Sequence, residues 1–489
     1  MCEDRLTSTV WESLGIESIG VGDDMRLKSA SSWLIAALLI TGIASATTVA
    51  LTIDEMGRAH SQVPASAPPP APPKDEGGSL AADVSKEIEK LRGWRFKQPV
   101  KTDTVTPGEV RRFVERQIDK SLPAGKLEIV QAFLRTIGLI PPAANLKDLQ
   151  LALLESQVAG FYDPDTKSMR LVSRGTMPPF VERMLLAHEL THALDDQYAN
   201  LKAFAGNGTH LSEDVSLARG SVTEGSATAL MFQYMVRAQM SGQADLKSLR
   251  EYAEQEKERS QIFEHSPKYF LSMVGTYICG TQFLARSPLF ALMLAPDNQQ
   301  VGKNFLAAIN DPPLSTEQIL HPDKYWVTDK RDDPVIIDDV AATTWLERDG
   351  RMVVHRDTVG EMLTTILTTP SNVPVNLATP EASVWSNASA SGWGGDRFYL
   401  LAAGGTAAAA GKALSDLKGV WVTTWDTTAD RDEFVAAVPL GSFGPRAAVQ
   451  LVDAATAIVY FGFDESERAV LTKRYTEKPV PMKKGTERR

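Results

Sequence analysis

Cysteine is almost absent from this 489-residue sequence, which contains only Cys2 and Cys279. Because Cys2 precedes the first apolar segment, no disulfide can join two parts of the main body. The low count also excludes a metal site built from several cysteines. Any metal ion must therefore be bound by histidine, aspartate and glutamate side chains.

Clusters of basic residues are also missing, apart from the C-terminal sequence PMKKGTERR. The net charge is −10, so the chain has no electrostatic basis for binding nucleic acid. We expect residues 476–489 to form a solvated basic tail. Hydrophobic residues make up 43% of the chain and charged residues 23%, which is typical of a globular protein and not of a disordered one.

Residues 29–53 contain no charged residue and include the apolar sequence WLIAALLITGIASATTVALTI, preceded by Arg26 and Lys28. This pattern indicates an export segment. It is either a signal peptide that begins at Met25 and is cleaved after the sequence ASA, or an uncleaved membrane anchor. In both cases the basic residues keep residues 1–28 cytoplasmic and direct the rest across the membrane. We therefore expect an extracytoplasmic protein, which is periplasmic, secreted or anchored facing outward.

The organisation after this segment follows from composition. Residues 54–80 are rich in proline and end in glycine and serine, which is typical of an extended spacer with a flexible end. We place the main domain at residues 81–331 and an α+β C-terminal region at residues 332–475, separated where RDDP interrupts the pattern. This C-terminal region is either a second domain or a lobe of the first.

Hydrophobic periodicity predicts an α+β fold in which helices predominate. The predicted helices of the main domain are 82–92, 107–120, 126–137, 146–158, 213–239, 246–263 and 270–285, with a further helix that carries the motif described below. A hairpin is predicted around Asp163-Pro164-Asp165, with residues 168–173 as its second strand. The C-terminal region is predicted to contain strands at 395–403, 419–427 and 454–463 and a helix at 430–438.

The sequence HELTH at residues 188–192 places two histidines four positions apart. In a helix such residues point the same way and lie about 6 Å apart along the axis, so His188 and His192 can bind one ion. Glu189 projects beside them and can accept a proton from a metal-bound water without being a ligand. Because the histidines continue an apolar stripe from Val181 and Leu185, we expect them to be half buried. Two ordinary core histidines are the alternative. It is disfavoured because two adjacent imidazoles on a buried face both need partners, and one metal ion supplies both.

A catalytic zinc of this kind has three protein ligands and an open position. The extension with a glycine and a third histidine is absent, because Asp195 and Tyr198 occupy those positions. Glu224 lies among small residues in TEGSATA and has no basic residue three or four positions away, so we predict it as the third ligand. The alternative is a glutamate at a helix-packing seam that pairs with a distant arginine. The reserve candidates are Glu213, Asp214 and His210.

Further candidates would support the reaction. Asp196 lies one turn after His192, where it would either orient that imidazole or face solvent. A donor to the oxyanion is also needed, and the candidates are Tyr277, His321 and Tyr325. For His321 the alternative is structural, because Ser315 and Gln318 predict a capping box and His321 would simply end that short helix.

Together these motifs resemble the gluzincin metallopeptidases, in which HExxH is followed by a glutamate on a later helix. HELTHAL is similar to the thermolysin-like version, although the spacing to Glu224 is longer and Thr228 replaces an acidic residue. The chain is also similar, over residues 94–325, to a group of uncharacterised bacterial exported HExxH proteins. The sequences that carry this similarity are QVAGFYDPDTK, HELTHALDDQY, TEGSA and PPLSTEQILHPDKYW. The resemblance implies a zincin-like core in residues 81–331 and an edge strand at 168–173 that pairs with an extended substrate.

The sequence therefore predicts an exported or membrane-anchored zinc metalloprotease that binds Zn²⁺ and cleaves protein or peptide substrates, with Glu189 as general base. The alternative is a non-catalytic, zinc-stabilised envelope protein that acts as a binding or scaffold module. An intramembrane protease is disfavoured by the charged residues that flank the motif. The sequence leaves open the oligomeric state, and whether residues 81–158 are scaffold or an inhibitory segment.

Overall fold

The computed structural model describes residues 76–121, 125–157, 160–172, 177–206, 211–245, 247–249, 251–252, 266–287, 298–347, 350–370, 385–404, 416–443 and 446–484. The predicted export segment, most of the spacer, His210 and most of the predicted helix at 246–263 lie outside these residues. Within the part described, no helix is both long and apolar enough to cross a membrane.

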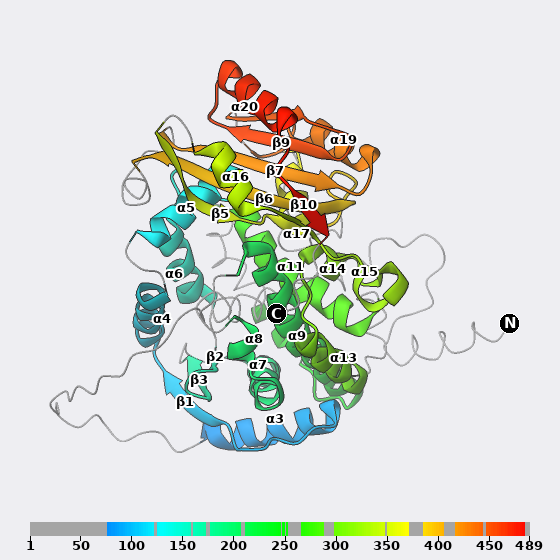
Figure 1. The fold of residues 1–489 in the computed structure, drawn as a ribbon. Coiled ribbons are helices and arrows are strands. Elements are labelled where there is room, and N and C mark those ends of the chain that lie inside the picture. The colour runs from blue at the N-terminus through cyan, green and yellow to red at the C-terminus, as the bar shows by residue number, and fades with distance from the viewer. Residues whose placement is uncertain are drawn as a thin grey trace.

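The chain has an α+β fold with a mainly helical half and a half built on a larger sheet (Figure 1). The helices are α3 (Glu76–Arg92), α4 (Pro107–Ser121), α5 (Lys126–Ile137), α6 (Leu146–Gln157), α7 (Pro179–Ala199), α8 (Leu201–Phe204), α9 (Glu213–Met240), α11 (Pro267–Ala285), α13 (Asn298–Asn310), α14 (Thr316–Leu320), α15 (Asp323–Trp326), α16 (Asp339–Leu346), α17 (Gly360–Thr368), α19 (Thr428–Ala437) and α20 (Glu465–Glu477). The strands are β1 (Lys101–Val105), β2 (Gly160–Asp163), β3 (Ser168–Val172), β4 (Val335–Ile337), β5 (Arg351–Asp357), β6 (Trp393–Ala403), β7 (Lys418–Trp425), β8 (Ala447–Leu451), β9 (Thr456–Phe461) and β10 (Met482–Lys484). The predicted helices and strands that fall on described residues are confirmed, with differences of a few residues at their ends. The prediction of a flexible end of the spacer is wrong for residues 76–80, which form the first turns of α3.

Two long helices, α9 and α11, form the centre of the helical half. Ser212 is the N-cap residue before α9, and its side chain accepts a hydrogen bond from the N–H of Val215. The two helices cross very closely, because a Cβ atom at Gly280 would lie only 1.9 Å from the carbonyl oxygen of Ser221. The small residues predicted to allow a close approach of α9 to another helix do so here.

The small sheet has the strand order β1-β3-β2, with β1 parallel and β2 antiparallel to β3. The hairpin turn is held by Asp163, whose carboxylate accepts from the N–H of Asp165 at 2.9 Å and from the hydroxyl of Thr166 at 2.8 Å. The prediction that residues 168–173 form an edge strand is wrong. Strand β3 is the central strand, because β1 arrives from a distant part of the sequence and covers its other side. The edge strand nearest α7 is β2.

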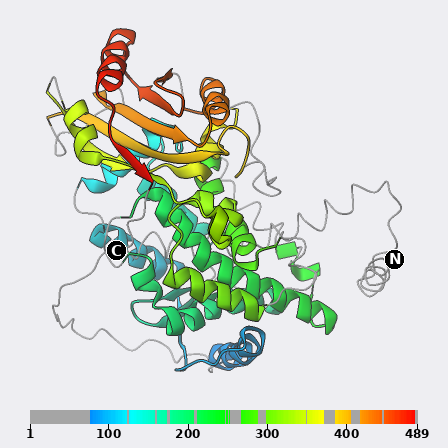
Figure 2. The ribbon, with the colours of Figure 1, turned by 45° about the vertical axis from the view of Figure 1, so that its right-hand side comes forward.

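The larger sheet is antiparallel with the order β5-β6-β7-β9-β8. Successive residues of a strand point to opposite faces, and in β6 both faces are covered. Phe398 and Leu400 point into the main apolar cluster, whereas Tyr399 and Leu401 pack with residues of α16 and α20. The views in Figures 1 and 2 agree that this sheet lies on one side of the helical half.

One apolar cluster joins the two halves. It contains residues from Ile129 in α5 to Phe461 in β9. Phe133 of α5 contacts Phe398 of β6, with 5.0 Å between ring centroids. The helical half and the sheet half therefore share a core across the position at Asp332 where the pattern of the sequence changes.

The C-terminal segment differs from its prediction. Residues 482–484 were expected in a solvated tail, but they form β10, which pairs antiparallel with β4. Lys484 also contacts the carboxylate of Asp332 at 2.6 Å. Pairing in this two-stranded sheet satisfies main-chain groups of residues 482–484 that a free tail would expose to water.

Candidate metal centre

Helix α7 carries the HExxH motif through the middle of the helical half. Pro179 is its first residue, a position where proline is well tolerated because its missing N–H has no partner in the helix. His188 is fully buried and His192 is 5% exposed. The prediction that both are half buried is wrong, because α7 is covered by α3, α9 and β2 and not by a single apolar neighbour.

Three side-chain atoms converge at this centre. The Nε2 atoms of His188 and His192 are 3.1 Å apart, and Oε2 of Glu224 lies 3.3 Å from the first and 3.4 Å from the second. Two donors that each bind a tetrahedral zinc at about 2.0–2.1 Å are about 3.3 Å apart. The donor types and their separations therefore fit one zinc ion.

Helix α9 delivers Glu224 to this position through its close crossing with α11. Ser221 and Gly225, on either side of Glu224 in sequence, both contact the backbone at Gly280. The side chain of Glu224 is buried. Among the described ion pairs its only partners are the two imidazoles, so the alternative of a distant arginine is not seen.

The electrostatics of the three donors are strongly coupled. Burial disfavours a charge on His192, but the Glu224 carboxylate outweighs this effect and raises the pKa of His192 to about 9. Burial likewise opposes ionisation of Glu224, but His192 and His188 lower its pKa to about 2. Glu224 is therefore an anion that requires a positive charge at the imidazoles, which a proton or a metal ion can supply.

Glu189 lies beside the three donors and is not part of their cluster. Its Oε2 atom accepts a hydrogen bond of 3.0 Å from the backbone N–H of Tyr162 in β2. Burial raises the pKa of Glu189. The sequence reasoning missed Tyr162, and only the prediction of a hairpin just before the motif helix pointed to this segment, because a main-chain donor has no side-chain signature.

Tyr277 is brought to the centre by α11. Its ring stacks on that of His188, with 6.0 Å between centroids and 24° between planes. Tyr277 therefore limits the movement of a donor imidazole. The structure thus places the ring of Tyr277 beside the centre, and its predicted role as a donor to the oxyanion stays a prediction.

His321 and Tyr325 lie elsewhere. His321 ends α14 and its Nε2 atom is 2.8 Å from Oε1 of Glu361, which agrees with its structural interpretation. Ser315 caps α14 as expected, whereas the side chain of Gln318 reaches the N–H of Leu314 and not that of Ser315. The hydroxyl of Tyr325 donates to the carbonyl of Asp311.

Asp196 does not orient an imidazole. Its carboxylate accepts from the Tyr162 hydroxyl at 2.7 Å, from Lys167 at 2.5 Å and from the N–H of Leu201 at 2.8 Å. Among the described residues, Nδ1 of His192 has no hydrogen-bond partner. Asp196 instead ties the hairpin to the end of α7.

The reserve ligands Glu213 and Asp214 stand at the start of α9. Asp214 is ten positions before Glu224, which corresponds to about 15 Å along a helix. Its carboxylate accepts from the N–H of Thr316 at 2.9 Å, and burial raises its pKa to about 7. Asp214 thus joins α9 to α14, whereas the N–H of Glu213 donates to Asp357 of β5 at 2.7 Å. Both residues are too far from the imidazoles to be ligands.

A second acidic group consists of Glu317, Asp332 and Asp426. The Lys324 ammonium lies 2.5 Å from Glu317, 2.9 Å from Asp426 and 3.4 Å from Asp332. Lys324 supplies the positive charge that these carboxylates require, so we assign no metal ion to them.

Residues 350–448 match a family model described as a domain of unknown function (DUF8575). No curated protein and no solved structure matches the chain. The matched segment begins just before β5 and ends within β8, so it covers most of the larger sheet. It contains neither Glu189 nor any of the three donors, and it carries no information on their chemistry.

Proposed function

We propose that this protein is a zinc-dependent metallopeptidase with a gluzincin-like site, in which His188, His192 and Glu224 bind Zn²⁺. The observation that carries the proposal is the convergence of these three buried donors within 3.4 Å of one another, with Glu189 beside them. The zincin-like character of the helical half, an extracytoplasmic location and export through residues 29–53 belong to the same proposal.

The chemistry divides between the ion and the chain. Zinc held by these donors would polarise a peptide carbonyl and make a water molecule more acidic. Glu189 accepts the proton of the attacking water and delivers it to the leaving amine. The N–H of Tyr162 fixes the orientation of this carboxylate, and Tyr277 supports the imidazole of His188 from the side.

An extended peptide is the substrate that the surroundings favour. Strand β2 has a described partner strand only on the side of β3, and it contacts the motif helix α7. Edge strands bind extended peptides through main-chain hydrogen bonds. Since the N–H of Tyr162 in this strand also holds Glu189, a peptide aligned on β2 would pass close to the general base.

The alternative remains a non-catalytic zinc protein of the envelope, in which the ion joins α7 to α9. Such a site has no use for Glu189, since a structural ion needs ligands but no base. The position of Glu189 next to the donors, held by a main-chain hydrogen bond, therefore favours the enzyme.

The test uses the purified full chain with and without a chelator. We expect about one zinc per chain by elemental analysis and cleavage of casein or a peptide library that the chelator abolishes. Glu189→Gln should keep the zinc and lower kcat/KM about 10²- to 10⁴-fold, the usual contribution of a general base.

Glu182→Gln, on the same helix and partly exposed, is the matched control and should leave the zinc content and kcat/KM unchanged. Full activity of Glu189→Gln contradicts the mechanism, whereas zinc without cleavage supports the scaffold alternative.

A further inference from the structure

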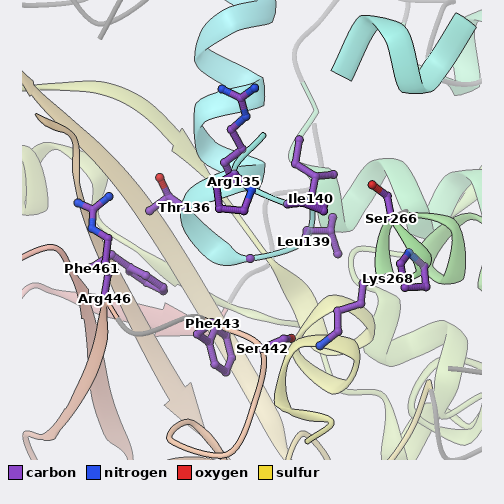
Figure 3. A pocket seen from close by; sticks show the side chains of 14 residues that line it. Arg135, Thr136, Leu139, Ile140, Ser266, Lys268, Ser442, Phe443, Arg446 and Phe461 are labelled. Carbon is purple, nitrogen blue, oxygen red and sulfur yellow. The ribbon is translucent and has the colours of Figure 1, made fainter. Parts of the chain in front are cut away.

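A cavity of about 430 Å³ lies where the helical half meets the sheet half. It is formed by the end of α5 and the loop after it, the start of α11, and the segments near β8 and β9 (Figure 3). Most of its lining is apolar, including Leu139, Ile140, Phe443 and Phe461. Its volume falls in the range of pockets that bind small molecules, about 300–1,000 Å³.

Two polar groups of the lining have no hydrogen-bond partner in the part of the chain that the structure describes. Ser266 is 1% exposed, and among the described residues its hydroxyl has no hydrogen-bond partner. The same holds for the Lys268 ammonium, whose nitrogen is also buried. An unpaired buried polar group lowers the free energy of unfolding by on the order of a few kcal/mol. The fold therefore keeps these two groups unpaired at a cost in stability.

The described neighbours of Lys268 do not compensate for its charge. Among the described residues that line the cavity there is no aspartate or glutamate. The other two cations of the lining are already engaged, because Arg135 donates to the carbonyl of Ala144 and Arg446 to that of Leu417. Burial without a counter-charge lowers the pKa of Lys268 to about 8.

The helix that carries these groups adds a positive field. Ser266 is the N-cap of α11, a helix of 19 residues, but its side chain does not cap the helix. The first N–H groups of a helix and its macrodipole favour an anion at this end. In Figure 3 the Lys268 side chain extends towards Ser442 and Phe443, away from the Ser266 hydroxyl, so the Lys268 ammonium is the group that can receive a negative charge beside the apolar lining.

We propose that this cavity binds a medium-chain monocarboxylate, with its head group at Lys268 and its alkyl chain along Phe443, Phe461 and Leu139. One ammonium matches one negative charge. The apolar lining matches a single alkyl chain, which gains about 0.8 kcal/mol for each methylene it buries. This site does not depend on the proposed metal centre, since Lys268 is nine residues before Tyr277 on α11, or about 14 Å along the helix.

The proposal is tested by titration calorimetry of the full chain with octanoate and with octanol, which has the same chain length and no charge. We expect octanoate to bind at least tenfold more tightly than octanol. Lys268→Met, which keeps the aliphatic stem, should weaken octanoate about 10- to 100-fold, the value of a charge-assisted hydrogen bond.

Lys303→Met is the control, because Lys303 is an exposed lysine on α13, and it should bind octanoate like the wild type. Octanoate that binds elsewhere on the protein contributes equally to the Lys303→Met and Lys268→Met titrations, so the difference between the two variants reports binding in the cavity. Equal binding of octanoate by Lys268→Met and the wild type overturns the proposal, as does equal binding of octanol and octanoate. Binding of a peptide with an apolar C-terminal residue in place of octanoate also overturns it. Should Lys268→Met fail to fold, the comparison of octanoate with octanol on the wild type still tests the proposal.

Discussion

The guanidinium of Arg92 lies 3.1 Å from both carboxylate oxygens of Asp195, and both side chains are buried. The hydroxyl of Ser226 accepts from Arg92 at 2.7 Å and donates to Asp195 at 2.6 Å. Asp195 is three residues after His192, and Ser226 is two residues after Glu224. One polar network therefore joins α3 to both helices that carry the donors, and this makes α3 a scaffold element of the site.

Replacement of Arg92 by methionine should be strongly destabilising. It leaves the Asp195 carboxylate buried without its counter-charge, and breaking a buried pair in this way costs about 3–5 kcal/mol. Urea unfolding of the variant measures the loss. Arg95→Met is the control, because the Arg95 side chain is 88% exposed, and it should change the free energy of unfolding by less than 1 kcal/mol. An Arg92→Met protein as stable as the wild type would show that α3 is dispensable, as an inhibitory segment would be.

Local patterns predicted most of the elements because the forces that set them are local. Residues 126–137 have helix-period apolar residues between Gly125 and Gly138, and α5 has these bounds. The pair His188 and His192 could be predicted because helical geometry alone puts them on one side of α7. Glu224 could be predicted because small neighbours signal a close helix crossing and a buried carboxylate requires a positive charge.

The errors share a different cause, since each depends on contacts between distant parts of the sequence. Strand β3 is central only because β1 pairs with it, Lys101 opposite Ser168. His188 and His192 are fully buried because α3 and α9 cover α7. Asp196 turns away from the imidazoles toward Tyr162 and Lys167. No periodicity within a segment contains this information.

The stability of the Lys268 variant should depend on pH in a specific direction. Burial lowers the pKa of Lys268 from 10.5 to about 8. Below about pH 8 the ammonium is charged in both the folded and the unfolded chain, so the full cost of burying it is present. Between about pH 8 and 10.5 the folded chain has released a proton that the unfolded chain keeps, so this cost decreases as the pH rises. The guanidinium groups of Arg135 and Arg446 stay charged throughout.

We therefore expect Lys268→Met to be more stable than the wild type at pH 7, by on the order of 1 kcal/mol, without any carboxylate present. The difference should shrink toward zero by pH 10. Denaturant unfolding at pH 7 and 10 measures both values, and Lys303→Met should show no such trend. A Lys268→Met protein that is less stable at pH 7 would indicate a structural partner for the ammonium, and not a group kept for a ligand.

The crossing of α9 and α11 should control the position of Glu224. In Gly280→Ala the new Cβ atom would meet the Ser221 carbonyl oxygen at 1.9 Å, far below an ordinary contact, so the two helices must separate. Overpacking of this kind costs about 1–3 kcal/mol, and it moves the carboxylate relative to His188 and His192. We expect a lower free energy of unfolding together with weaker zinc binding in a chelator competition.

Gly108→Ala is the matched substitution for this experiment. A Cβ atom at Gly108 lies 3.5 Å from Nη1 of Arg112, an ordinary contact on a helix outside the site. Since Gly108 needs no unusual backbone conformation, alanine there should be neutral or stabilise the chain by about 0.4–1 kcal/mol, with zinc affinity unchanged. If Gly280→Ala loses stability but keeps full zinc affinity, α9 can shift without moving Glu224 from the imidazoles, and the helix crossing is not what sets the geometry of the three donors.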